Sequence, residues 1–141
     1  MLTENDVVQA VVGYLRENDY FIERALSTAE RGIDIVAVNQ RTKRKLYVEA
    51  KGGTSSKKTT KRYGKPFTPG QAKVHVSVAL CCAAHLYQHS VADGADVALA
   101  FPDGIVHRNL VQNISRALQV LAVGVYFVDE NKKVQVFKEA A

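Results

Sequence analysis

The 141 residues are enough for one domain with a substantial core but leave little room for a separate DNA-reading domain. Apolar residues make up 47%, charged residues 23% and the net charge is +5, which is the balance of a soluble globular protein. The sequence lacks an apolar run of about 18 residues and begins with acidic residues where a signal peptide is basic, so we expect a cytoplasmic protein with one domain over residues 1–141 and no membrane contact.

A helix is predicted to begin at the N-terminus. Thr3 would cap it, with Asp6 at the third helical position. Apolar residues at helical spacing, ending with Leu15, form its buried stripe. Glu4 lies on the same face at the N-terminal end, either as an exposed first-turn acid stabilised by the helix dipole or as an acid that faces a metal site. Residues 20–26 are then predicted to form the first strand.

Two short apolar runs, 34–39 and 46–51, flank a basic turn and predict a β-hairpin. Asp34 stands at the start of the first run, while Glu49 and Lys51 stand near the end of the second. If the numbers of paired residues add to an odd value such as 83, Asp34 lies opposite Glu49 and Lys51 projects from the same face. An even value would place the two acids on opposite faces. A solvated hairpin with a cross-strand ion pair is the alternative, but the nearly continuous apolar runs favour strands covered on both faces.

Two carboxylates placed opposite each other, with Cβ atoms about 5 Å apart, would repel each other. A divalent cation would turn this repulsion into binding, and Mg²⁺ favours one or two carboxylates, waters and phosphate oxygens. Asp34 and the Glu49-Ala50-Lys51 tripeptide resemble the motif of the PD-(D/E)XK nuclease superfamily, although Ile33 stands where the name of the motif has Pro. The predicted order of elements over about residues 3–101 resembles this superfamily too.

The resemblance implies an α/β, restriction endonuclease-like fold. A mixed central β-sheet would be flanked by helices on both faces, with an αβββαβ core followed by a C-terminal helix and hairpin. The implied activity is that of a Mg-dependent endodeoxyribonuclease in restriction, repair or recombination. The alternative is a catalytically inactive nucleic-acid-binding or partner-docking module of the same fold.

The resemblance also implies the ligands of the metal. Asp34, Glu49 and the Ala50 carbonyl would hold Mg²⁺, for which Mn²⁺ can substitute, and Glu4 would be a further ligand. Lys51 would orient or deprotonate the attacking water, with a pKa depressed by burial and a cationic environment.

A strongly basic segment follows the hairpin. Residues 43–73 contain ten Lys and Arg against Glu49 alone, so the segment carries +9 and the rest of the chain −4. This pattern is typical of phosphate binding, with a solvated loop as the alternative, and it predicts a nucleic-acid partner, first of all DNA. Tyr63 either stacks on a base or sugar or anchors the loop. The predicted nucleic-acid-binding residues are Lys57, Lys58, Lys61, Arg62, Tyr63, Lys65 and Lys73.

A second helix is predicted to start with Thr68 as its cap. Gln71 is either the partner of Thr68 in a capping box or a residue that supports catalysis near Lys51. The helix is apolar almost all round, so we expect it to be buried against the sheet and a neighbour, with Cys81 and Cys82 as small buried hydrophobes.

Histidines continue along the second helix. His85 and His89 could share a metal ion, but a third ligand is not obvious and a half-buried stripe that contacts another subunit is the better interpretation. Cutting both strands of a duplex needs two sites, so we expect a homodimer. The rest of the chain predicts a strand at 96–101, a helix at 107–122 and strands at 123–128 and 134–137.

Overall fold

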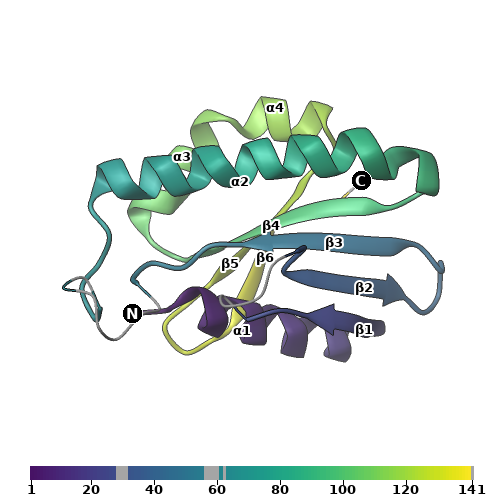
Figure 1. Ribbon diagram of the computed structural model, residues 1–141, viewed down its shortest axis with the longest axis horizontal. Coiled ribbons are helices and arrows are strands. Elements are labelled where there is room, and N and C mark those ends of the chain that lie inside the picture. The colour runs from purple at the N-terminus through teal and green to yellow at the C-terminus, as the bar shows by residue number, and fades with distance from the viewer. Residues whose placement is uncertain (28–31, 56–60, 62, 141) are drawn as a thin grey trace.

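The computed structural model describes residues 1–27, 32–55, 61 and 63–140. These residues form an α/β structure in which a six-stranded mixed sheet lies between helices on both faces (Figure 1). The elements in chain order are α1 (Glu4–Glu17), β1 (Tyr20–Ala25), β2 (Ile35–Asn39), β3 (Lys45–Ala50), α2 (Pro69–Ser90), the 3-10 turn η1 (Val91–Asp93), β4 (Asp96–Pro102), α3 (Ile105–Asn113), α4 (Ser115–Val120), β5 (Gly124–Val128) and β6 (Val134–Lys138). Among the described residues, none of the helices combines the length and apolar character that crossing a bilayer requires.

The strands lie side by side in the order in which they occur along the chain, from β1 to β6. The β1–β2, β2–β3 and β5–β6 pairs are antiparallel, whereas β3–β4 and β4–β5 are parallel. Parallel neighbours need crossover connections, which α2 provides between β3 and β4, and α3 with α4 between β4 and β5. The predicted mixed sheet with helices on both faces is therefore confirmed.

Each face of the sheet has its own apolar core. On one face, the buried stripe of α1 packs against alternate residues of β2 and β3, including Ile35, Val48 and Ala50. On the other face, α2, α3 and α4 pack against β4 and β5, with Leu99 and Phe101 fully buried between them. Because side chains alternate along a strand, Glu49, which lies between Val48 and Ala50 in β3, faces the α2 side.

Both predicted helix caps form. The Thr3 side chain accepts a hydrogen bond from the Asp6 backbone N–H, and the Asp6 carboxylate accepts one from the Thr3 N–H. At the start of α2, the Gln71 backbone N–H donates to the Thr68 hydroxyl, and the Thr68 N–H donates to the Gln71 side-chain oxygen. These reciprocal bonds satisfy N–H groups that a helix start leaves without partners.

Two expectations about the helices are wrong. The expected helix at 107–122 is two helices, because the backbone leaves the helical conformation at Ile114 (φ −117°, ψ 15°). Asn113 and Ser115 flank this break, and both residue types compete with a helix for backbone hydrogen bonds. The second helix is not covered all round: Val74 and Val78 are 59% and 45% exposed.

Candidate active site

The hairpin register brings the predicted acids to the same place. Ile35 pairs with Val48, and every β2–β3 pair follows the same sum of 83, so the odd register is confirmed and Asp34 comes opposite Glu49. The Asp34 carboxylate accepts a hydrogen bond from the backbone N–H of Ala50 at 2.8 Å. This register is favoured because it places Ile35 and Val48 in the apolar core on the α1 side.

The amine of Lys51 completes the cluster. Its Nζ atom lies 3.1 Å from Glu49 Oε1, and the two side chains are only 17% and 13% exposed. The backbone N–H of Lys51 donates to the carbonyl of Ala100, which continues the parallel pairing of β3 with β4. The cluster therefore lies at the carboxyl ends of two parallel strands, where open α/β sheets commonly bind ligands.

Glu4 reaches the same cluster from the first turn of α1. The backbone around Gly52 packs against this turn so closely that a Cβ atom on Gly52 would lie 2.4 Å from the Glu4 nitrogen. The neighbouring Gly53 N–H donates to the Leu2 carbonyl at 2.8 Å. Only glycine permits such an approach, and this contact places the start of α1 beside Lys51. Sequence reasoning missed the role of Gly52, although a glycine directly after Lys51 was a usable signal.

The carboxylates disturb one another's protonation. Burial, with smaller contributions from the repulsion of Glu49 and Glu4, raises the pKa of Asp34 to about 7, although the Ala50 hydrogen bond and Lys51 act in the opposite direction. Burial likewise raises the pKa of Glu4, with attraction to Lys51 opposing and repulsion from Glu49 adding to the rise. The cluster therefore holds more acid groups than the single amine can compensate.

The pKa of Lys51 moves in the direction opposite to our expectation. Burial alone would lower it, but attraction to Glu49, a hydrogen bond to the same carboxylate, and the charges of Glu4 and Asp34 together raise the pKa above its ordinary value. The expected cationic environment is absent among the described neighbours, because acids surround the amine. Lys51 is thus an ammonium ion at neutral pH in this arrangement.

Two residues of α2, His75 and Cys82, lie near the cluster, and sequence analysis had not predicted them there. Lys51 helps to lower the pKa of His75, on which burial acts more strongly, and Glu49 helps to raise the pKa of Cys82, after burial. The His75 ring packs edge-on against Phe67 at 4.5 Å between centroids. His75 lies one helical turn after Gln71, and this spacing could have indicated that it faces the cluster.

The predictions for the other residues of α2 fare differently. The Gln71 side chain serves the helix cap, and its role in catalysis stays a prediction. The cysteines are not fully buried, which corrects our expectation: Cys81 is exposed and Cys82 is half-buried. The rings of His85 and His89 lie 4.5 Å apart between centroids. Within the described residues, the His, Cys, Asp and Glu side chains do not gather in any group of three or more that could hold a metal ion.

The predicted nucleic-acid-binding residues are only partly described. Lys57, Lys58 and Arg62 lie outside the described residues, so their placement stays a prediction. The described members of the set, which are Lys61, Tyr63, Lys65 and Lys73, are all exposed, Tyr63 by 42%.

Other cations of the basic segment are engaged in ion pairs. Arg44 forms two hydrogen bonds with Asp96, and Lys45 lies 3.5 Å from Glu23. The charge of +9 that the sequence assigns to residues 43–73 therefore includes cations that bind within the fold. The exposed lysines after the hairpin are the better candidates for binding an external polyanion.

Comparison with known proteins found neither a family model that matches the chain nor a similar curated protein.

Proposed function

We propose that this protein is a metal-dependent nuclease that hydrolyses phosphodiester bonds, first of all in DNA, with a restriction endonuclease-like fold of the PD-(D/E)XK type. The observation that carries this proposal is the register that brings Asp34 and Glu49 to one face, with the Lys51 amine 3.1 Å from Glu49. Two acids and a lysine at the ends of adjacent strands are the parts that such a reaction needs.

Asp34 and Glu49 are ligands of the kind that a divalent cation takes, although they form no ready group of three with another described His, Cys, Asp or Glu. Asp34 and Glu49 provide carboxylate oxygens, and the raised pKa of Asp34 reflects burial together with repulsion that a bound cation would relieve. Mg²⁺, or Mn²⁺ in its place, would supply positive charge to the phosphate and acidify the attacking water. Glu4 and the carbonyl of Ala50 are further candidate ligands.

The residues of the site would have separate roles in hydrolysis. Asp34 and Glu49 would position the phosphate through the cation, while the Lys51 ammonium would stabilise the charge that develops on the phosphoryl oxygens. As an ammonium ion, Lys51 is better suited to this electrostatic role than to removing a proton from water. The exposed Lys65 and Lys73 would hold the nucleic-acid backbone without reading its sequence.

A homodimer would supply the two sites that double-strand cleavage needs. Light scattering at several protein concentrations would test this, and a monomer throughout would favour nicking of single strands.

A plasmid cleavage assay tests the function directly. We expect nicking with Mg²⁺ or Mn²⁺, none with EDTA, and a reduction of at least about 100-fold in Lys51→Ala. Lys133→Ala is the matched control, because Lys133 is an exposed lysine in the turn between β5 and β6. Cleavage that survives EDTA or the removal of the Lys51 amine would contradict the proposal, and DNA binding without cleavage would indicate an inactive module.

A further inference from the structure

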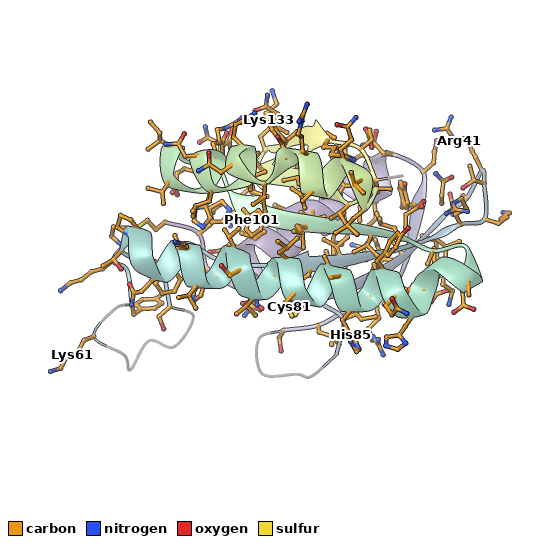
Figure 2. The ribbon with its side chains drawn as sticks, turned by 90° about the horizontal axis from the view of Figure 1, so that it is seen from above. Arg41, Lys61, Cys81, His85, Phe101 and Lys133 are labelled. Carbon is orange, nitrogen blue, oxygen red and sulfur yellow. The ribbon has the colours of Figure 1, made fainter. Side chains whose placement is uncertain are left out.

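A pocket opens directly beside the carboxylate cluster. It has a volume of about 340 Å³, and Glu49 forms one wall of it. Ile33 lines it from the segment before β2, and Cys81, His85 and Leu86 line it from α2. Figure 2 shows Cys81 and His85 on the edge of α2 that points away from α3 and α4. The pocket therefore lies outside the apolar core, on an edge that solvent reaches.

The walls of this pocket suit a flat, largely apolar ligand with polar edges. Its volume falls in the range of about 300–1,000 Å³ that is typical of small-molecule sites. Ile33 and Leu86 offer apolar surface for the faces of a ring, and His85 offers ring nitrogens that can donate or accept a hydrogen bond. Nucleobases that leave the base stack are bound in this way, between apolar side chains and polar groups at the ring edge.

The position of the pocket restricts what can occupy it. Glu49 belongs both to the pocket and to the proposed catalytic cluster, so an occupant would lie beside a phosphate held at the cluster. A second hollow of about 360 Å³ shares Ile33 and continues along β1 and β3, where Arg24 lines it together with the ion pair of Lys45 and Glu23. A strand that leaves the pocket would thus meet the guanidinium of Arg24.

We propose that this pocket binds an unpaired nucleobase of the nucleic-acid substrate, next to the phosphate that is cleaved. The inference rests on the proposed nuclease function and names its substrate class: single-stranded, bulged or branched nucleic acid. A base in a regular duplex must first be unpaired and unstacked, whereas a base that is already unpaired avoids most of this cost. The pocket therefore favours substrates with unpaired bases over perfect duplexes.

Three DNA duplexes of one sequence, differing at a single position, test the inference. The position holds 2-aminopurine paired with thymine, 2-aminopurine as an unpaired bulge, or an abasic sugar as a bulge. Binding is followed by 2-aminopurine fluorescence with Ca²⁺ in place of Mg²⁺, and cleavage is then measured with Mg²⁺. We expect the emission of the bulged base to rise several-fold on binding. We also expect the bulged duplex to be cut at least about tenfold faster than the paired one, equivalent to about 1.4 kcal/mol.

Two variants of α2 distinguish the pocket from the rest of the protein. Cys81→Phe places a large side chain at the pocket from an exposed position, so it should not disturb the core. It should abolish the rise in emission and the preference for the bulged base, so that the variant cuts the bulged duplex no faster than the abasic one. Ala84→Phe adds the same ring at an exposed position of the helix that does not line the pocket, and should behave as the wild type.

The two proposals fail in different ways. If no substrate is cut, the nuclease function is wrong, and the fluorescence with Ca²⁺ still decides whether the pocket binds a base. Cleavage at equal rates on all duplexes, unaffected by Cys81→Phe, would overturn the base pocket while leaving the nuclease function intact. If Cys81→Phe instead changes the oligomeric state in light scattering, with no change in emission on binding, a second copy of the chain covers the pocket and the inference is overturned.

Discussion

Replacing Asp34 by Asn should stabilise the protein at neutral and alkaline pH. Burial, with repulsion from Glu49 and Glu4, raises the pKa of Asp34 from 3.8 to about 7. The folded state therefore binds this proton more tightly than the unfolded state, and the free energy of unfolding of the wild type falls as the pH rises from about 4 to about 7. Asn has no proton to lose, and its side-chain oxygen can still accept the hydrogen bond from the Ala50 N–H.

The size of this effect follows from the shift in pKa. About three pKa units at about 1.4 kcal/mol each set an upper limit of about 4 kcal/mol above pH 7. Asp34 is only half-buried, so screening by water will reduce this, and we expect about 1–2 kcal/mol. For a chain of this size, that gain corresponds to a rise of about 5 °C in the melting temperature.

Calorimetry between pH 4 and pH 8 measures the prediction. The difference in melting temperature between Asp34→Asn and the wild type should be near zero at pH 4, grow through pH 5 to 7 and then level off. Asp93→Asn removes a charge from an exposed site and is the matched control. A variant that is less stable than the wild type at pH 8, or a difference that does not change with pH, would refute the argument from burial and repulsion.

Two further predictions concern the surroundings of the cluster. Gly52→Ala should destabilise the fold by at least about 2 kcal/mol, because its Cβ atom would lie 2.4 Å from a backbone nitrogen of α1. Gly13→Ala has nothing within 4 Å of the added atom and should instead stabilise α1 by about 0.5–1 kcal/mol; denaturant titrations compare the two. Replacing Lys65 and Lys73 together by Ala should lower the slope of log K against log salt by about 0.9 for each phosphate of duplex DNA that these lysines neutralise. An unchanged slope would mean that these lysines are only solvated.

The sequence predicts the central hairpin well because its requirements agree with one another. Apolar residues run nearly continuously along both strands, a basic turn joins them, and of the two registers considered the odd one buries Ile35 opposite Val48. The same register places Asp34 opposite Glu49. Local patterns of this kind involve neighbouring residues, so they can be interpreted before any tertiary structure is known.

The sequence predicts poorly what depends on distant segments. A helix that is apolar all round predicts burial all round, but α2 lies across β3 and β4 and leaves Val74 and Val78 toward solvent. The pKa of Lys51 is raised mainly by Glu49, and Glu4 adds to this rise from α1, whose first turn packs closely against Gly52. Neither contact has a local signature in the sequence beyond the glycine itself.

The charge of the cluster leads to a last prediction, on protons released when metal binds. Glu4, Asp34, Glu49 and Lys51 carry a net charge of −2 when all are ionised, which matches a divalent cation. Because the pKa of Asp34 is raised to about 7, the cluster without metal holds a proton in place of part of that charge near neutral pH. A metal needs the ionised carboxylates, so its binding must displace this proton.

Titration calorimetry of Mg²⁺ at pH 6.5 in buffers of different ionisation enthalpy should detect a release of between about half and one proton per site. The same titration of Asp34→Asn should show weaker binding and less release, whereas binding with no proton release in the wild type would mean that the metal does not bind at these carboxylates.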